Sequence, residues 1–157
     1  MRFPSVFRLT PLVATALLTG TLATAQAPER DTAQEAANLA LVTTFYEGVF
    51  LDHDVAAASS VVAGDYIQHN PHVPDGKAPF VDFFTGLFAE NPAAKNEIVR
   101  SAASGDLVWL HVHATSGADD RGRAIVDIFR VEDGLIVEHW DVTQTIPETA
   151  ANDNGMF

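Results

Sequence analysis

The chain of 157 residues has no cysteine, and it has few basic residues. The absence of cysteine excludes disulfide bonds and a lipidated cysteine, and it is compatible with an oxidising compartment. The sequence has nine lysines and arginines and 21 aspartates and glutamates, which gives a formal net charge of −12. This acidity argues against nucleic acid and anionic membranes as partners, and it favours neutral or cationic small molecules. There is no internal repeat and no low-complexity tract.

The first 25 residues have the pattern of an export signal. Arg2 and Arg8 precede an apolar run over 9–22, and a small-x-small motif ends at Ala25. Thr15, Thr19, Gly20 and Thr21 within the run disfavour the alternative, a membrane anchor. We therefore predict a signal peptide over 1–25, a periplasmic or secreted protein, and no membrane association after cleavage. Removing two of the nine basic residues and no acid leaves seven minus 21, or −14.

The first part of the remaining chain has helical patterning. Thr32 and Glu35 fit a capping box, which predicts a helix over 32–50. Asp54 is suited to cap a short helix over 55–62. Five large apolar side chains recur along 78–89, and this stripe predicts a third helix with a core-facing side. The intervening segment DYIQHNPHVPDG (65–76) is too irregular to predict a regular element, and we expect the histidines at 53 and 72 to be exposed in loops.

Beyond Pro92 the apolar period changes from helical to two. Strands are predicted over 95–103, 107–115, 123–131 and 135–145, joined by turns. Consecutive strands with short turns form an antiparallel meander, so the fold class is α+β, with helices on one face of a sheet. The domain covers 26–157, and the small, polar tail from about 147 is expected to be flexible.

The last two strands, AIVDIFRVEDGLIVEHWDVTQ, contain charged residues within apolar runs. A three-residue loop with Gly134 in the left-handed region predicts that Asp127 pairs with His139. Phe129, His139 and Asp141 then share one face with Asp127. A two-residue loop is the alternative, and it would place a tryptophan opposite Asp127.

The preceding strand, LVWLHVHAT, carries a second polar set. Trp109, His111 and His113 alternate and therefore share one face. Two such histidines are suited either to bind a metal or to act as a base with its partner. We predict that they meet Asp127 and Asp141 in a pocket, and that no metal binds there, since no dedicated metal motif such as HExxH is present.

These residues carry a resemblance to a known family. The order of elements, YIQHNP, and VDIFRVEDGLIVEHWDV resemble the SnoaL-like proteins of the NTF2-like superfamily. The resemblance implies a cone in which three N-terminal helices pack on a strongly curved antiparallel sheet. Members include polyketide cyclases, ketosteroid isomerases, limonene epoxide hydrolases and non-catalytic binding modules, so the fold is implied more specifically than the activity.

The resemblance also implies roles for residues. Asp127 matches the cyclase aspartate that works with a histidine, which would be His113 or His111. Asp141 matches one carboxylate of the epoxide hydrolases, whose other acid–base residues have no match here. The isomerase base falls at Asn70, which cannot abstract a proton.

We therefore predict cofactor-independent acid–base chemistry, an aldol condensation, cyclisation or isomerisation, on a small hydrophobic carbonyl compound. The competing prediction is a periplasmic module that only binds a hydrophobic molecule. An apolar outer face of the sheet predicts a homodimer. The predicted catalytic residues are Asp127, His113, His111 and Asp141, and the predicted substrate-binding residues are His69, Asn70, His139, Trp109, Phe129 and Tyr46.

Overall fold

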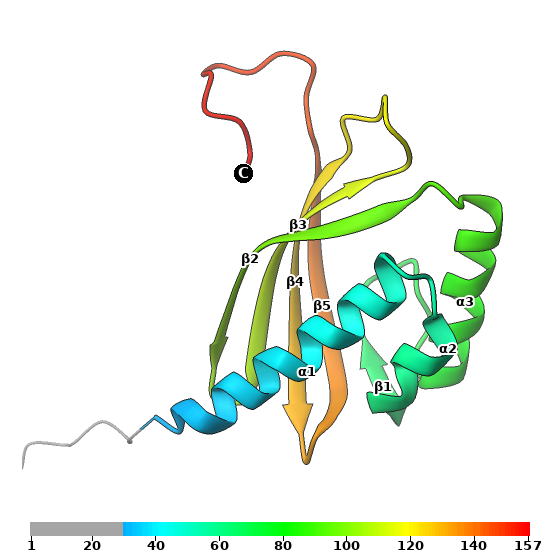
Figure 1. Cartoon of the computed structure of the whole chain (residues 1–157), viewed down its shortest axis with the longest axis vertical. Coiled ribbons are helices and arrows are strands. Elements are labelled where there is room, and N and C mark those ends of the chain that lie inside the picture. Colours follow the sequence, from blue (N-terminus) through cyan, green and yellow to red (C-terminus); the bar gives the residue numbers. More distant parts are fainter. Residues whose placement is uncertain (1–29) are drawn as a thin grey trace, which may run out of the picture.

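The computed structural model describes residues 30–157, and the predicted signal segment lies outside them. Three α-helices pack against a curled, five-stranded mixed sheet (Figure 1). This arrangement confirms the predicted α+β class and the NTF2-like cone. The elements are α1 (Thr32–Phe50), α2 (Val55–Ala58), the 3₁₀ turn η1 (Ser59–Val61), β1 (Val62–Gln68), α3 (Lys77–Glu90), β2 (Lys95–Ser104), β3 (Leu107–Thr115), β4 (Arg123–Glu132) and β5 (Leu135–Thr145).

The long helix α1 begins with a different cap from the predicted one. Asp31 is the N-cap, and its carboxylate accepts a hydrogen bond from the backbone N–H of Gln34 at 3.0 Å. Thr32 is already within the helix. Glu35 does not reach back to the N-cap, because its carboxylate accepts from the backbone N–H of Gly105 at 2.9 Å. The side chain thereby ties α1 to the turn between β2 and β3. No helix within residues 30–157 is long and apolar enough to cross a membrane.

The strand β1 was not predicted, because its residues lack a clear alternating pattern. It is formed by parallel pairing with β5, in which Ile67 lies opposite Glu138 and Gln68 opposite His139. The predicted second helix correspondingly ends early, at Ala58. The sheet order is β1-β5-β4-β3-β2, so the predicted antiparallel meander gains one parallel edge strand.

The turn between β4 and β5 contains two residues and not the predicted three. Asp133 and Gly134 both have positive φ values, 50° and 76°, and the strands close with Glu132 opposite Leu135. Positive φ at both central residues is the requirement of a type I′ turn, whose twist matches that of the flanking strands.

A register shift just after Arg130 offsets the shorter turn. One residue of β5, Val137, is left over between the paired positions, as in a β-bulge. Asp127 consequently pairs with Asp141, and not with His139 as predicted. Because the predicted and observed registers differ by two residues, the predicted faces are still correct.

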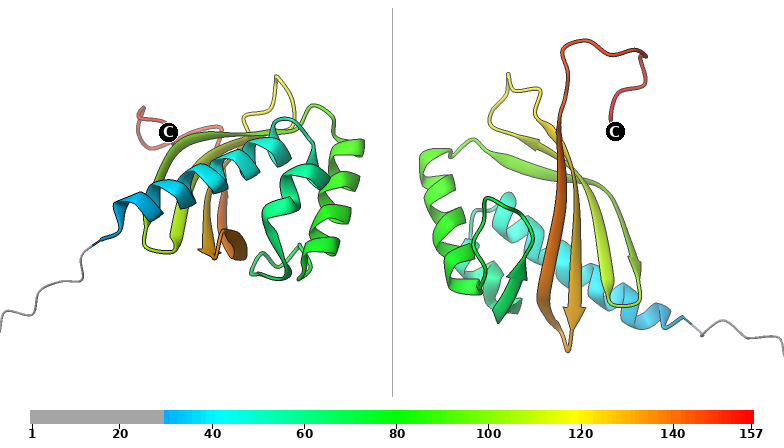
Figure 2. Two further views of the ribbon diagram at one scale, coloured as in Figure 1. Left: turned by 60° about the horizontal axis from the view of Figure 1, so that its bottom comes forward. Right: turned by 180° about the vertical axis from the view of Figure 1, so that it is seen from behind.

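The core lies between α1 and the concave face of the sheet (Figure 2). Three residues of α1 (Val42, Phe45 and Val49) are at most 2% exposed, as helical spacing predicts for one buried face. The opposing residues of β3 are Val108, Leu110 and Val112, which are fully buried. This packing decides which face of every strand looks into the cone.

Candidate functional site

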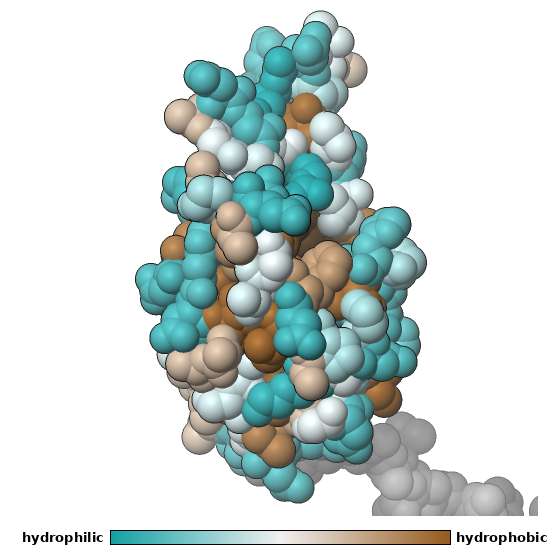
Figure 3. All heavy atoms as spheres, turned by 90° about the vertical axis from the view of Figure 1, so that its right-hand side faces the viewer, coloured by the Kyte–Doolittle hydropathy of each residue, from teal (hydrophilic) through white to brown (hydrophobic). Residues whose placement is uncertain are grey.

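A cavity of about 560 Å³ opens between the concave face of the sheet and the helices. One wall is aromatic and comes from α1 and α3. The α3 stripe predicted as core is only partly core: Phe80 and Phe88 are buried, whereas Phe83 and Leu87 are each 37% exposed. Figure 3 shows hydrophobic residues at the centre of the face that α3 presents, surrounded by hydrophilic ones. The aromatic lining residues are Phe45, Phe50, Phe80, Phe83, Phe84, Phe88 and Phe129, together with Tyr46 and Tyr66.

The opposite wall is polar and comes from β4 and β5. Side chains at every second position of both strands face the cavity, so cross-strand pairs form successive rungs. From the deep end to the mouth these rungs are Phe129 with His139, Asp127 with Asp141, Ile125 with Thr143, and Arg123 with Thr145.

Asp127 is the centre of a buried hydrogen-bond network. The residue is 5% exposed, and its Oδ2 accepts a hydrogen bond from the Tyr46 hydroxyl at 2.8 Å. The other carboxylate oxygen, Oδ1, lies 3.0 Å from Nε2 of His139. Burial and the negative charge of Asp127 raise the pKa of Tyr46 well above its usual range. The phenol therefore keeps its proton and donates a hydrogen bond with it. The Tyr46 oxygen in turn accepts from Asn96.

The hydrogen bonds of His139 determine where its protons are. The backbone N–H of Asn70 can only donate, and it donates to Oε1 of Gln68, so this oxygen is an acceptor. The same oxygen lies 2.8 Å from Nδ1 of His139, and Nδ1 must therefore carry a hydrogen. A single further proton then lies between Nε2 and Asp127. The pair thus holds one transferable proton and is neutral overall, whichever of the two atoms carries it.

Asp141 stands beside this pair as a second carboxylate. It is directly opposite Asp127 across the strands, is half-buried, and accepts a hydrogen bond from the Asn70 side chain. Asp127, His139 and Asp141 each offer one potential metal-ligand atom, and these three atoms all lie within 4.8 Å of one another. A histidine and two carboxylates are suited to hold a divalent metal, but a metal would have to displace the shared proton. The predicted absence of a metal stays a prediction.

The predicted positions of His111, His113 and Trp109 were wrong. In the pairing of β3 with β4, Leu110 lies opposite Asp127 and shares its face. The three predicted residues alternate with the buried ones, so they lie on the outer face of the sheet. None of them lines the cavity.

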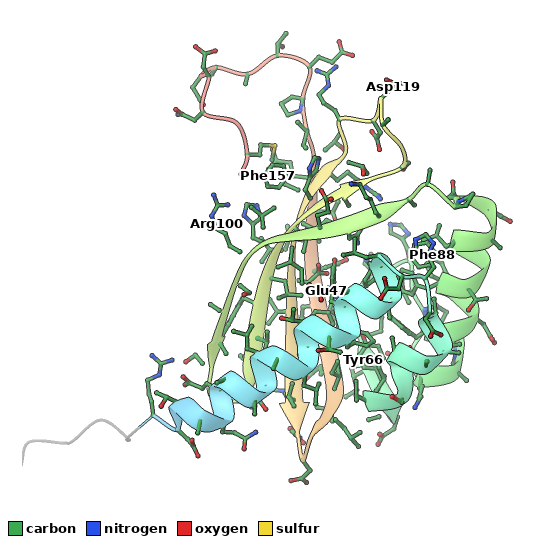
Figure 4. The ribbon with its side chains drawn as sticks, in the orientation of Figure 1. Glu47, Tyr66, Phe88, Arg100, Asp119 and Phe157 are labelled. Carbon is green, nitrogen blue, oxygen red and sulfur yellow. The ribbon has the colours of Figure 1, made fainter. Side chains whose placement is uncertain are left out.

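The two histidines instead hold other parts of the outer face. The ring of Phe157 packs against both, with centroids 5.2 Å from His111 and 4.6 Å from His113. Nδ1 of His111 also lies 2.9 Å from the Arg100 guanidinium, and Figure 4 shows Arg100 and Phe157 close together beside β2 and β3. Nε2 of His113 donates to the carbonyl of Arg121 at 2.9 Å. The end of the tail, predicted to be flexible, is therefore packed on the sheet.

His69 also lies outside the cavity, contrary to the prediction. Its Nε2 is 2.8 Å from Glu138, and its ring stacks on Trp140 with centroids 4.9 Å apart. The guanidinium of Arg130 lies over the Trp140 ring, with its Cζ 5.6 Å from the ring centroid, and it donates a hydrogen bond to Glu138. Arg130 and Trp140 therefore face away from the cavity, and Glu138 is paired.

Of the residues predicted to bind substrate, four line the cavity: Tyr46, Asn70, Phe129 and His139. Sequence reasoning missed other polar lining residues, among them Gln68, Asn96 and Arg123. The alternation of Asn96 with Ile98 on β2 was a usable signal for Asn96. Gln68 had none, because its strand is defined only by distant pairing with β5.

Comparison with known proteins agrees with this geometry. The family model described as the SnoaL-like domain matches residues 42–139. The chain belongs to the SnoaL-like family. No curated protein matches this SnoaL-like chain in sequence.

Solved structures similar to the SnoaL-like chain share its fold. An NTF2-like protein of unknown function from Mesorhizobium loti is 24% identical, with a TM-score of 0.59, covering 71% of this chain and 93% of that one. A proposed ketosteroid isomerase from Kribbella flavida is 21% identical, with a TM-score of 0.58 and coverages of 78% and 86%. A proposed SnoaL-like polyketide cyclase from Jannaschia sp. CCS1 is 18% identical, with a TM-score of 0.59 and coverages of 76% and 90%.

Proposed function

We propose that this SnoaL-like chain is an enzyme that performs cofactor-independent acid–base chemistry on a small apolar carbonyl compound. The reaction class is proton transfer next to the carbonyl, as in an aldol condensation, a cyclisation or an isomerisation. The observation that carries the proposal is the buried hydrogen-bonded pair of Asp127 and His139 at the polar wall of an otherwise aromatic cavity. A general acid and a general base each contribute a factor of roughly 10²–10⁴ to a rate.

In this mechanism the two carboxylates have different roles. Asp141 accepts a proton from the carbon next to the carbonyl. The Asp127–His139 pair donates its proton to the carbonyl oxygen, so the enol forms without a build-up of negative charge. Tyr46 holds Asp127 in place from the side opposite His139, and Asn70 holds Asp141. Like charges on adjacent carboxylates are avoided, because the pair of Asp127 with His139 is neutral overall.

The cavity wall supports an apolar, ring-containing substrate. The phenylalanines of α1 and α3 contact one another in tilted and edge-to-face arrangements, for example Phe50 with Phe84 at 5.1 Å. Such surfaces bind flat hydrophobic molecules without fixing their orientation, whereas the few polar groups at the sheet fix it. A volume of about 560 Å³ lies within the usual range for small-molecule sites.

The test uses β-tetralone, an apolar ketone with acidic hydrogens next to its carbonyl. In heavy water, enzyme-catalysed enolisation replaces these hydrogens by deuterium, which proton NMR follows as a loss of signal. We expect Asp127→Asn to reduce the rate at least 100-fold, a loss at the low end of what one catalytic proton donor contributes. The fold should be retained, since an asparagine can donate to His139 Nε2 and accept from Tyr46, but it cannot give up the proton. Asp65→Asn, on the exposed side of β1, is the control.

The competing function, a module that only binds hydrophobic molecules, is favoured by the aromatic wall alone. It predicts that β-tetralone binds to the wild-type protein without exchange above the buffer rate. An Asp127→Asn protein that exchanges deuterium as fast as wild type would contradict the enzymatic proposal.

A further inference from the structure

We propose that the substrate of this site carries a carboxylate, which Arg123 binds at the cavity mouth while the carbonyl lies at Asp127. This inference rests on the proposed function and adds the chemical class of the substrate, an apolar keto acid. It arises from the rungs that β4 and β5 present to the cavity. Arg123 is the only lysine or arginine among the described residues that line the cavity.

The position of Arg123 defines the length of the substrate. Arg123 and Asp127 lie on the same face of β4, four residues apart, and both line the cavity. At a rise of about 3.3 Å per residue, their Cα atoms are roughly 13 Å apart along the strand. Arg123 is exposed whereas Asp127 is buried, so the former marks the mouth and the latter the deep end. A molecule that contacts both would be elongated.

The cavity-lining residues beside Arg123 are polar and uncharged. Thr145 lies directly opposite it on β5, and hydroxyls of Thr115, Ser116 and Thr143 line the same part of the cavity. Within residues 30–157, Arg123 forms no ion pair, whereas Arg30, Arg121 and Arg130 each bind a carboxylate. An unpaired guanidinium with neighbouring hydroxyls can bind a carboxylate through two parallel hydrogen bonds.

The loop before Arg123 is held in a fixed conformation. The carboxylate of Asp120 accepts from the backbone N–H groups of Ser116 and Gly122, and these bonds lower the pKa of Asp120, with a smaller contribution from the charge of Arg123. Gly122 has a φ of +82°, and a Cβ there would lie 2.1 Å from the carbonyl oxygen of Ala114. The backbone that presents Arg123 is therefore closely packed, which limits the entropy lost when it binds a ligand.

The charge of the whole protein alone favours neutral or cationic ligands, and Arg123 changes this only locally. Asp120, whose charge interacts with that of Arg123, already has both carboxylate oxygens bonded to the backbone. A single carboxylate is thus the anion for which the mouth is suited, since a multiply charged anion would meet one cation and an acidic surface.

The experiment compares β-tetralone bearing a carboxypentyl chain on its aromatic ring with the methyl ester of the same compound. Deuterium exchange gives kcat/KM, and calorimetry gives Kd without requiring turnover. We expect wild type to prefer the acid by roughly fivefold in both measurements, as for one charge-assisted contact near solvent. The preference should decrease with ionic strength. It should disappear in Arg123→Gln and persist in Arg121→Gln. The second variant removes the same charge two residues earlier in the chain, where the side chain does not line the cavity.

The outcomes separate this inference from the proposed function. Exchange of both compounds at equal kcat/KM would overturn the carboxylate inference and leave acid–base catalysis standing. Absence of exchange with tighter binding of the acid, dependent on Arg123, would support the inference and overturn the catalytic proposal. An equal loss of preference in Arg121→Gln would reduce the effect to the general charge of the protein and overturn the assignment to Arg123.

Discussion

Replacing Tyr46 by phenylalanine tests whether the Asp127 network is as tightly coupled as its geometry indicates. The substitution keeps the buried ring, which packs on Phe50 at 4.4 Å and on Phe129 at 6.1 Å. It removes only the hydroxyl that donates to Asp127 at 2.8 Å and accepts from Asn96 at 3.1 Å.

The expected loss follows from the asymmetry of buried hydrogen bonds. A bond to a charged or proton-sharing group contributes about 1.5–3 kcal/mol, and a buried acceptor left without a donor has a desolvation cost of about 1–3 kcal/mol. Both figures describe the loss of the same bond to one oxygen of Asp127, so they are not added. We therefore expect Tyr46→Phe to lower the free energy of unfolding by about 2–3 kcal/mol. A shift of Tm of roughly 2–4 °C per kcal/mol should accompany it.

Tyr66 provides the matched control. It is as buried as Tyr46, at 1% exposure, but its hydroxyl only accepts a neutral hydrogen bond from Gln68 at 3.2 Å. Tyr66→Phe should therefore cost only about 0.5–1.5 kcal/mol. Urea unfolding followed by tryptophan fluorescence measures both variants. If Tyr46→Phe costs no more than Tyr66→Phe, the Tyr46–Asp127 bond contributes nothing special, and the reasoning on the network is refuted.

Two further predictions concern the outer face of the sheet. The hydrogen bond from His69, and then that from Arg130, lower the pKa of Glu138, so its contribution to stability is present above pH about 4.5 and is lost as the pH falls through the lowered folded-state pKa. The stability difference between wild type and Glu138→Gln should thus be constant above about pH 5 and shrink in more acidic urea titrations. The predicted homodimer should form through the exposed apolar residues of β4 and β5, and Val142, at 72% exposure, is the most open of them. Light scattering at micromolar concentration should give a dimer for wild type and a monomer for Val142→Arg, and a monomeric wild type would contradict the prediction.

The sequence was sufficient for the extents of α1 and α3 to within a residue or so and for four of the five strands, because their apolar periods are local and regular. It failed for β1, whose residues 62–68 become a strand only by pairing with β5, some 70 residues later. It also failed at the start of α1, where Asp31 and Thr32 are both suitable caps. The bonding of Glu35 to the distant Gly105 decides between them.

For the site, alternation along β3 correctly predicted that His111, His113 and Trp109 share a face, but not which face. That choice depends on the pairing of Leu110 with Asp127, which is a tertiary feature. The faces of β4 and β5 were predicted correctly although the turn was not. The shorter turn and the extra residue in β5 together preserve the parity of the two strands.

The extra residue also decides which length changes this hairpin tolerates. Because Val137 lies between the inward Ile136 and the outward Glu138, its loss would remove the bulge and leave every later residue of β5 on its present side. Beyond Glu138 the strand alternates regularly, so loss of Trp140 would instead turn Asp141 to the outer face. A one-residue deletion at the bulge is therefore expected to be far less damaging than one further along the strand, even though both remove a single apolar residue.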